Sequence, residues 1–192
     1  AWGKNKFSKN FSWVDLDNKA AIEKITNYLI KNKHKQISYI NISEKYNFAS
    51  ERKASFLKTL KKNKIRFNKD YYASVKLEEP EKSFEIIKKM LSKNKKITSI
   101  ICSTEFSALS AIKACNFLNL EIGTDISIIT FDGPLVKDLS TPPITAISFP
   151  VQELGKRAIK ILLKGHSNKK HYSNFQAKSD IIERGSVHQV RD

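Results

Sequence analysis

Asp125-Ile-Ser-Ile-Ile-Thr-Phe-Asp-Gly133 is the stretch of the sequence that decides the fold class. Its central part, 126–131, is an apolar run interrupted only by two hydroxyl residues. Short apolar runs between polar residues are typical of strands buried inside a parallel sheet. An aspartate directly after such a strand lies at the sheet edge where open α/β folds bind ligands. The stretch therefore predicts an α/β domain that binds a small molecule and performs no chemistry on it.

Segments of two kinds alternate on both sides of this stretch. Helix-like segments carry apolar residues three or four positions apart, whereas strand-like segments are short and rich in β-branched residues. The expected helices are 18–33, 49–62, 81–91, 103–118 and 151–164, with Asp17 capping the first and Gly165 ending the last. The expected strands are 36–42, 71–77, 97–102, 126–131, 144–149 and 178–183. This alternation predicts a parallel sheet with helices on both faces.

The composition is that of a globular domain. The chain has 192 residues, of which 40% are hydrophobic, enough for one large domain or two small lobes. No apolar run approaches the roughly 20 residues that a membrane-spanning helix needs. The first residues lack both a methionine and the apolar core of a signal peptide, so they do not resemble a natural N-terminus. The two cysteines, Cys102 and Cys115, stand among apolar residues without metal-ligand spacing, which predicts buried free thiols.

The net charge of +16 raises the question of nucleic-acid binding. Lysine supplies 30 of the 35 basic residues, and asparagine and isoleucine are also abundant, as expected from an AT-rich genome. The lysines are scattered along the chain, and runs such as 61–64 and 93–96 fall where helices should end and where cations favour the helix dipole. We therefore expect a solvated basic surface rather than a DNA contact made by this chain.

Motifs of catalysis and cofactor binding are absent from the sequence. It contains no phosphate-binding Walker loop, no dinucleotide-binding glycine pattern and no nucleophile elbow or zinc-protease motif. His34 lies between two lysines at a helix end, which favours a capping or surface role. His166, His171 and His188 have no carboxylate at ligand spacing. We expect neither an enzyme nor a bound metal or cofactor.

Two polar residues are candidates for ligand contacts. Asp132 ends the buried strand, where it either opens a tight turn or accepts hydrogen bonds from ligand hydroxyls. Arg52 is the first arginine of a lysine-rich chain. Its planar set of donors suits either a fixed pocket geometry or a structural ion pair. Both alternatives remain open for each residue.

Several motifs stand in a characteristic order along the chain. The stretch 125–133, followed by Pro142-Pro-Ile-Thr-Ala-Ile147 and Glu153-Leu-Gly-Lys-Arg-Ala158, resembles the closing signature of the LacI/GalR transcriptional repressors. Four upstream segments and one downstream segment also resemble the family in order and spacing, from about residue 11 to 187: 13–18, 28–37, 48–56, 102–111 and 181–187. The chain departs from the family pattern where Lys33, Ser55 and Ser110 replace glycines and where Thr104-Glu105 replaces Asn-Asp.

The resemblance implies a periplasmic-binding-protein-like fold with two lobes of parallel sheets flanked by helices, represented here mainly by the C-terminal lobe. Residues 1–17 and 149–165 are expected to be segments of the N-terminal lobe. Residues 18–148 and 166–192 are expected to form the C-terminal lobe. The helix-turn-helix DNA-binding domain of the family is expected to be absent from this chain.

The resemblance further implies a cytoplasmic, homodimeric repressor whose cleft binds a sugar and thereby controls binding to operator DNA through a domain outside this chain. The segment 47–52, together with 13–15, is most similar to regulators of the α-glucoside type. The family's pocket carries over onto seven positions: Asp17, Phe48, Arg52, Thr104, Glu105, Asp132 and Phe149. Glu105 is expected either in the pocket or as a carboxylate at a helix start.

Two other functions remain open. A periplasmic sugar-binding protein of a transporter shares the fold, and it would carry a signal peptide upstream and no DNA-binding domain. A sensing domain that has lost its sugar site and recruits a partner protein is the second alternative, because family glycines are replaced and Thr104-Glu105 is altered.

Overall fold

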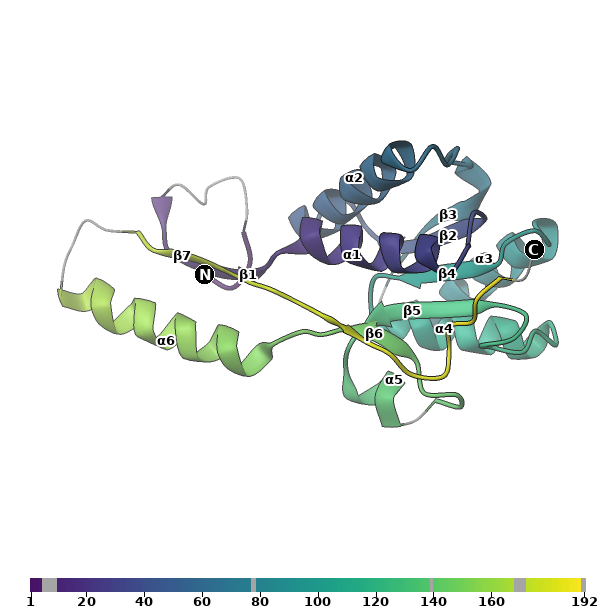
Figure 1. Cartoon of the computed structure of the whole chain (residues 1–192). Helices are drawn as coiled ribbons and strands as arrows, with labels where there is room; N and C mark the ends of the chain where they lie inside the picture. Colours follow the sequence, from purple (N-terminus) through teal and green to yellow (C-terminus); the bar gives the residue numbers. More distant parts are fainter. Residues whose placement is uncertain (5–9, 77–78, 139, 168–171, 191–192) are drawn as a thin grey trace.

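The chain forms a large α/β part and a smaller elongated layer beside it (Figure 1). The computed structural model describes residues 1–4, 10–76, 79–138, 140–167 and 172–190. A six-stranded sheet lies at the centre of the large part, in the order β3-β2-β4-β5-β6-β8. Its strands are β2 (Ile37–Ile42), β3 (Tyr72–Val75), β4 (Ser99–Cys102), β5 (Ser127–Phe131), β6 (Thr145–Ile147) and β8 (Ile181–Ile182). All neighbours pair in parallel except β6 and β8, which are antiparallel.

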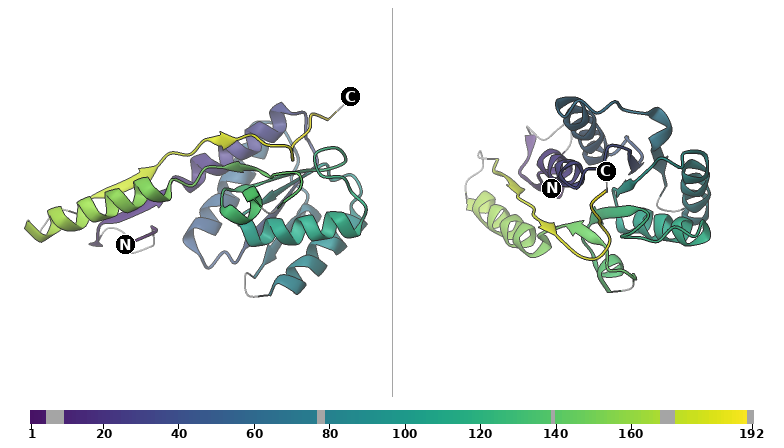
Figure 2. Two further views of the ribbon diagram at one scale, coloured as in Figure 1. Left: turned by 90° about the horizontal axis from the view of Figure 1, so that it is seen from below. Right: turned by 45° about the vertical axis from the view of Figure 1, so that its right-hand side comes forward.

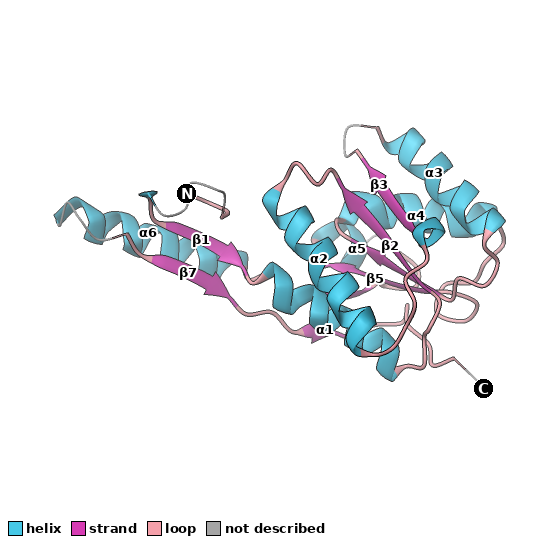
Figure 3. Ribbon diagram, turned by 90° about the horizontal axis from the view of Figure 1, so that it is seen from above, coloured by secondary structure: helices cyan, strands magenta, loops and turns pink. Residues whose placement is uncertain are grey.

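Helices cover both faces of this sheet, as the alternation of segments predicted. They are α1 (Asn18–Lys31), α2 (Asn47–Lys62), α3 (Pro80–Lys93), α4 (Glu105–Phe117) and the short α5 (Pro134–Asp138). Helices α1 and α2 pack together on one face and α3 and α4 on the other (Figure 3). Each pair closes a separate apolar core, one around Tyr39 and Phe56 and the other around Ile87 and Ile100.

The central strands are buried along their whole length because helices cover both faces. Every residue of β4 and β5 is buried, as expected for an apolar run in a parallel sheet. Strand β2 has alternating apolar and polar residues in the sequence, yet all six are buried. Its polar side chains bond internally, because the Ser38 hydroxyl donates to the Ser99 carbonyl and the Asn41 amide donates to the Ala49 carbonyl.

The smaller layer consists of a two-stranded parallel sheet and one long helix (Figures 1 and 2). Strand β1 (Trp13–Leu16) pairs with β7 (Asn174–Ala177), and helix α6 (Val151–Ser167) packs on them through Leu154 and Ala158. The chain enters the large part after β1, returns at α6 and β7, and crosses again to β8 (Figure 1). Strand β7 thus lies beside β1, although it falls within 166–192, the range expected in the C-terminal lobe, and its polar sequence does not predict a strand.

Three further expectations are corrected or completed by the structure. Helix α6 continues through Gly165 to Ser167 instead of ending at the glycine. Helix α5 was not expected, because five residues are too few to show a helical period. Leu77, expected at the end of a strand, lies outside the described residues, and β3 ends at Val75. Both cysteines are buried free thiols, as predicted. No described helix is long and apolar enough to cross a membrane.

Candidate ligand-binding cleft

A cleft of about 800 Å³ opens where the smaller layer meets the carboxyl ends of the sheet strands. Both parts of the chain line this cleft. The lining residues are Trp2, Gly3, Lys4, Asp15, Asn18, Glu44, Lys45, Tyr46, Asn47, Phe48, Ser50, Arg52 and Phe149. Three of the seven residues expected from the sequence are therefore brought together here: Phe48, Arg52 and Phe149.

Arg52 is the most constrained side chain of the cleft. Only 6% of its surface is exposed, although it carries a charge. Its Nε donates to Asn18 Oδ1 at 2.8 Å, and its Nη1 donates to the Ser103 carbonyl at 2.9 Å. Burial lowers the pKa of the guanidinium to about 10, so it stays protonated at neutral pH. These bonds fix the planar group in one orientation at the floor of the cleft.

Aromatic rings surround this guanidinium. Its central carbon lies 3.5 Å from the centre of the Phe131 ring and 4.8 Å from that of the Phe48 ring. Phe48 also stacks on Tyr46, with ring centres 5.9 Å apart. Phe149 lies where the chain leaves β6 for α6. It packs against the core around Tyr39 and Phe56 and also against the small core that Leu154 forms with β1 and β7. The cleft thus combines flat apolar faces with a fixed set of charged donors.

A chain of hydrogen bonds links the smaller layer to Arg52. The backbone N–H of Lys4 donates to Asp15 Oδ2, and Asn18 Nδ2 donates to Asp15 Oδ1. Asn18 in turn accepts the bond from Arg52 Nε. Lys4 also forms an ion pair with Glu51 of α2 at 3.4 Å. The acid of the Val-Asp-Leu-Asp segment that lines the cleft is therefore Asp15, which sequence reasoning missed in favour of Asp17.

Asp17 and Thr104 act as helix caps in the structure. The Asp17 carboxylate accepts a hydrogen bond from the Ala20 backbone at the start of α1, as also predicted. Thr104 begins α4 through a reciprocal capping box with Ser107. Neither residue lines the cleft described above. Short polar side chains are favoured both at helix starts and in binding sites, so the sequence alone cannot separate these two roles.

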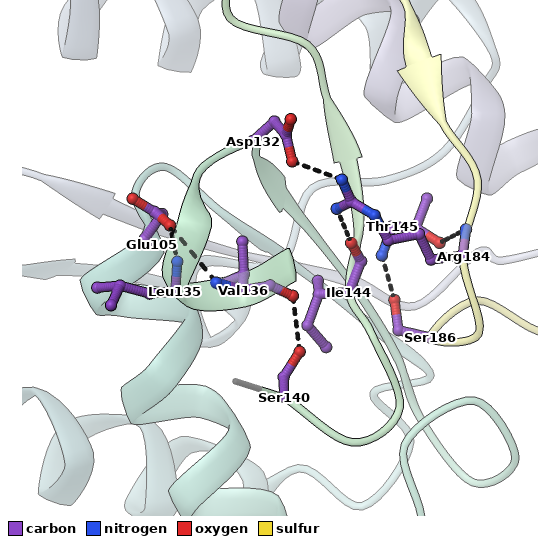
Figure 4. Close-up of polar contacts among 9 residues, drawn as sticks. All are labelled: Glu105, Asp132, Leu135, Val136, Ser140, Ile144, Thr145, Arg184 and Ser186. Atoms are coloured by element: carbon purple, nitrogen blue, oxygen red, sulfur yellow. Dashed lines mark hydrogen bonds and ion pairs between the residues drawn. The ribbon is translucent and has the colours of Figure 1, made fainter. Parts of the chain in front are cut away.

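Glu105 reaches from the first turn of α4 to the start of α5 (Figure 4). Its Oε1 accepts hydrogen bonds from the backbone of Leu135 at 2.8 Å and of Val136 at 3.4 Å. A β-carbon at position 133 would coincide with this carboxylate, which explains the glycine there. The Glu105 carboxylate therefore stands at two helix starts. Glu105 is the first residue of α4, and its side chain accepts hydrogen bonds from the first turn of α5.

Asp132 forms an ion pair with Arg184, 2.7 Å from Oδ1 to Nη2 (Figure 4). Arg184 also donates through Nη1 to the Ile144 carbonyl, and its backbone N–H donates to Thr145 Oγ1 at 3.0 Å. These contacts tie β8 to the end of β5. The Asp132 side chain keeps 25% of its surface exposed, but it does not line the cleft.

His34 lies at the opposite end of the sheet and is fully buried, so the surface role expected for it is wrong. Its Nδ1 lies 2.9 Å from Thr98 Oγ1, and its Nε2 lies 3.0 Å from the His188 carbonyl. Burial lowers the pKa of His34 to about 4 and also lowers that of His188. Both histidines hold the C-terminal segment on the sheet, because the His188 ring bonds Ser127. Among described residues, no group of three or more His, Cys, Asp or Glu could hold a metal.

Two α/β layers that enclose a polar and aromatic cleft define the class as a two-lobed ligand-binding fold. The chain belongs to the periplasmic binding protein-like domain family, whose model matches residues 26–187. Its relatives place it among the ligand-binding domains of LacI-family transcriptional regulators.

Comparison with individual proteins supports this placement. The chain is 30% identical over 187 residues to the HTH-type transcriptional repressor PurR of Histophilus somni, an alignment that covers 97% of this chain and 55% of the relative. A LacI-family regulatory protein from Chloroflexus aggregans superposes with a TM-score of 0.84 at 25% identity, covering 97% of this chain and 67% of the other. A LacI-family regulator from Enterococcus faecium with bound ribose gives 0.85 at 18% identity, over 98% and 69% of the two chains. The chain spans about half the length of the curated relatives it matches.

Proposed function

We propose that this chain is the effector-sensing part of a LacI-type repressor and that a sugar binds in the cleft between its two layers. The observation that carries the proposal is the cleft itself, in which a rigid guanidinium lies among aromatic rings where the two layers meet. The proposed ligand contacts are Phe48, Arg52 and Phe149 from the seven predicted positions, together with Asp15.

The chemistry of these side chains suits a sugar. One face of a pyranose ring presents C–H groups that pack on aromatic rings, and its hydroxyls both donate and accept hydrogen bonds. Charged partners form stronger hydrogen bonds to hydroxyls than neutral ones do. Arg52 supplies donors and Asp15 supplies acceptors on opposite sides of Asn18. We also propose Asp132 as a second acceptor of hydrogen bonds from the ligand. Its carboxylate would then release Arg184 and bind a ligand hydroxyl instead. We place α-glucosides first among the sugars to test.

The two layers correspond, in this proposal, to the two lobes of the family. Residues 1–17, 149–165 and β7 belong to the N-terminal lobe, and 18–148 with β8 and the residues after it belong to the C-terminal lobe. The Lys4–Glu51 ion pair crosses between them, and Lys24 of α1 pairs with Asp180 in the segment that leads from β7 to β8. A ligand that touches both lobes favours the closed arrangement because its affinity differs between the two states. Closure would then change DNA binding by a homodimer in the cytoplasm, without any reaction on the ligand.

Calorimetry tests the site. The full-length protein is titrated with a panel of sugars, α-glucosides included, and the sugar that binds is titrated again into Phe48→Ala and Asp132→Ala. We expect Phe48→Ala to weaken binding at least about tenfold, because it removes an apolar face and frees one side of Arg52. Phe117→Ala, an exposed aromatic residue on α4, is the matched control. Unchanged affinity in Phe48→Ala and in Asp132→Ala would contradict the site.

The transporter alternative makes a different prediction. A periplasmic sugar-binding protein would bind the same ligand but no DNA, and its gene would encode a signal peptide upstream. If the domain has lost its sugar site and recruits a partner protein, the full-length protein should bind DNA and no sugar of the panel should change that binding. A gel-shift assay of the full-length protein with and without the sugar separates all three functions.

A further inference from the structure

Two tyrosines and an asparagine form a polar cluster behind the ligand cleft. Tyr39 and Asn41 are two residues apart in β2, so their side chains point to the same face of the sheet. Both are fully buried. Tyr72 lies opposite Tyr39 in the edge strand β3 (Figure 3), and the two rings meet edge to face with their centres 5.8 Å apart. The register of β2 and β3 therefore brings two hydroxyls and one amide together.

The direction of the hydrogen bonds in this cluster follows from the chemistry of its members. The Ala49 carbonyl can only accept, so the nitrogen of the Asn41 amide faces it, at 2.9 Å. The amide oxygen accepts from the Ser103 hydroxyl at 2.7 Å. Because that hydroxyl has a single hydrogen, Tyr39 must donate to it, at 2.9 Å. The Asn41 nitrogen also donates to the Tyr72 hydroxyl at 3.2 Å, which leaves the hydrogen of Tyr72 free for another acceptor.

Glu44 is the acceptor of that hydrogen. The Tyr72 hydroxyl donates to Glu44 Oε1 at 3.0 Å, and Lys53 Nζ donates to the same oxygen at 2.6 Å. Lys53 also lies over the Tyr72 ring, 4.4 Å from its centre. Burial raises the pKa of Tyr72 to about 12, and the hydrogen bond from Lys53 lowers the pKa of Glu44. At neutral pH the tyrosine therefore keeps its proton and the glutamate is a carboxylate.

The cluster connects two charged side chains that line the ligand cleft. Glu44 lies in the segment from β2 to α2, and residues 44–48 all line the cleft. Arg52 is bonded to the cluster through the Ser103 carbonyl. Within the described part of the chain, both hydrogen bonds to Glu44 end on Oε1, and Oε2 has no partner. A held carboxylate with one unused oxygen at a cleft suits a ligand that donates a hydrogen bond.

We propose that Glu44 accepts a hydrogen bond from the ligand and that Tyr72 is the residue that positions it. Glu44 is not among the seven positions that the family resemblance supplied. The inference rests on the proposed function, because the group that Glu44 binds is a hydroxyl of the sugar. Tyr72 does not line the cleft, and it acts through the carboxylate that its hydroxyl holds. The cleft then selects sugars that carry a hydroxyl where Glu44 Oε2 can accept it.

Hydrogen exchange of the full-length protein tests the positioning role without ligand. Tyr72→Phe removes the hydroxyl that bonds Glu44 and keeps the ring. Tyr71→Phe is the matched control, because its hydroxyl bonds none of the described residues. We expect the backbone amides of 44–50 to exchange about fivefold faster in Tyr72→Phe and at the original rate in Tyr71→Phe. Equal exchange in the two variants would overturn the positioning role.

Calorimetry of the full-length protein, with the sugar that binds, tests the contact. Glu44→Gln keeps the size of the side chain but not its charge, and we expect it to weaken binding about tenfold. Glu85→Gln, which changes an exposed carboxylate paired with Lys88 on α3, should leave binding unchanged. Tyr72→Phe should weaken binding about fivefold by itself and very little when Glu44→Gln is already present, because it acts through Glu44. Thermal unfolding of each variant confirms that it folds.

Deoxy analogues of the same sugar separate a contact from a general loss of structure. One analogue lacks the hydroxyl that Glu44 accepts. With that analogue, Glu44→Gln and the unsubstituted protein should bind equally well, whereas the other analogues should keep the tenfold difference of about that size. A difference that persists with every analogue would show that Glu44 does not contact the sugar.

Failure of this inference and failure of the proposed function give different results. If Phe48→Ala weakens binding and Glu44→Gln does not, the cleft remains the site and the contact from Glu44 is overturned. If the losses from Tyr72→Phe and Glu44→Gln add in the double variant, Tyr72 does not act through Glu44. If the unsubstituted protein binds no sugar, the proposed function is overturned together with the contact.

Discussion

Arg52 is the residue on which the geometry of the cleft depends most. It bonds α1 through Asn18, the end of β4 through Ser103, and the rings of Phe48 and Phe131. Two alternatives followed from the sequence, a ligand contact or a structural ion pair. Its partners in the structure are a carbonyl, an amide oxygen and two rings, so it needs no direct carboxylate partner, and it lines the cleft.

The first prediction concerns the shape of this side chain. Arg52→Lys keeps the charge but loses the planar group that bonds Asn18 and Ser103 together. We expect unfolding in urea to show a loss of about 2 kcal/mol, the order of a hydrogen bond to a buried charge. Arg66→Lys, on an exposed arginine, should change stability by less than about 0.5 kcal/mol. Equal effects of the two substitutions would contradict the role given to Arg52.

A second prediction follows from the buried imidazole of His34. Its pKa is about 4 in the folded protein and 6.5 in the unfolded chain. As the pH falls, the unfolded chain therefore takes up a proton at His34 before the folded protein does. The contribution of neutral His34 is complete above pH 6.5 and is lost as the pH falls from 6.5 towards 4. Stability should decrease by at most about 1.4 kcal/mol per pH unit in that window from this group.

Denaturant unfolding at several pH values measures this effect. In His34→Gln the decrease between pH 6.5 and 4 should be smaller than in the unsubstituted protein, because the titrating group is gone. The same pH dependence in both proteins would show that His34 is not the group responsible. The environment predicted for this histidine was wrong because the segment that buries it, around His188, is distant along the chain.

At the scale of elements, three helices end in a left-handed backbone conformation at a residue other than glycine. Helices α1, α2 and α4 each end with a left-handed residue, Lys33, Lys64 and Asn119, with φ between 54° and 64°. In each, the next backbone N–H bonds back to a carbonyl in the last turn, as after Lys64, where Ile65 donates to Leu60. The turn at Lys33 therefore keeps the glycine geometry despite the substitution.

The third prediction uses one of these turns. Lys64→Gly should raise the free energy of unfolding by about 0.5 to 1 kcal/mol, because glycine adopts positive φ without steric cost. Lys61→Gly, placed inside the last turn of the same helix, should lower it by about 1 kcal/mol. Thermal or urea unfolding measures both. A loss of stability in Lys64→Gly would show that its backbone conformation is not strained.

The fourth prediction concerns Glu105 and α5. Glu105→Ala removes the acceptor for the Leu135 and Val136 amides, and we expect a loss of about 1 kcal/mol of stability. Hydrogen exchange of these amides should become faster. Glu105→Gln, which keeps one acceptor oxygen, should show a smaller effect. If Glu105→Gln leaves stability unchanged but binds the ligand much more weakly than the unsubstituted protein does, Glu105 contacts the ligand.

Elements differed in how well the sequence predicted them. Strands β4 and β5 were located to within two residues, since an apolar run in a parallel sheet is a strong local pattern. Helices α1 to α4 were found from their apolar spacing. Strand β7 and helix α5 were missed, because β7 is stabilised by pairing with β1, far away in sequence, and α5 by one carboxylate from another helix.

At the scale of the whole molecule, the cleft depends on contacts that no local pattern encodes. Asp15 and Lys4 line the cleft because β1 and the residues before it lie beside the start of α2. Phe149 lines the cleft because the chain crosses there from β6 to α6. The motifs pointed to Phe48, Arg52 and Phe149 through family resemblance. They also pointed to Asp17 and Thr104, which cap helices, since a resemblance identifies positions but not the direction of a side chain.

The central claim is that occupation of this cleft controls DNA binding, and one titration tests it most directly. Affinity of the full-length protein for its operator, found by selection from random DNA, is measured with increasing sugar for the unsubstituted protein and for Phe149→Ala. We predict a change of about 5- to 150-fold in the unsubstituted protein, the usual range of allosteric coupling. Phe149→Ala should bind DNA equally well without sugar and respond only at much higher concentration. An unaltered sugar response in Phe149→Ala would contradict the claim.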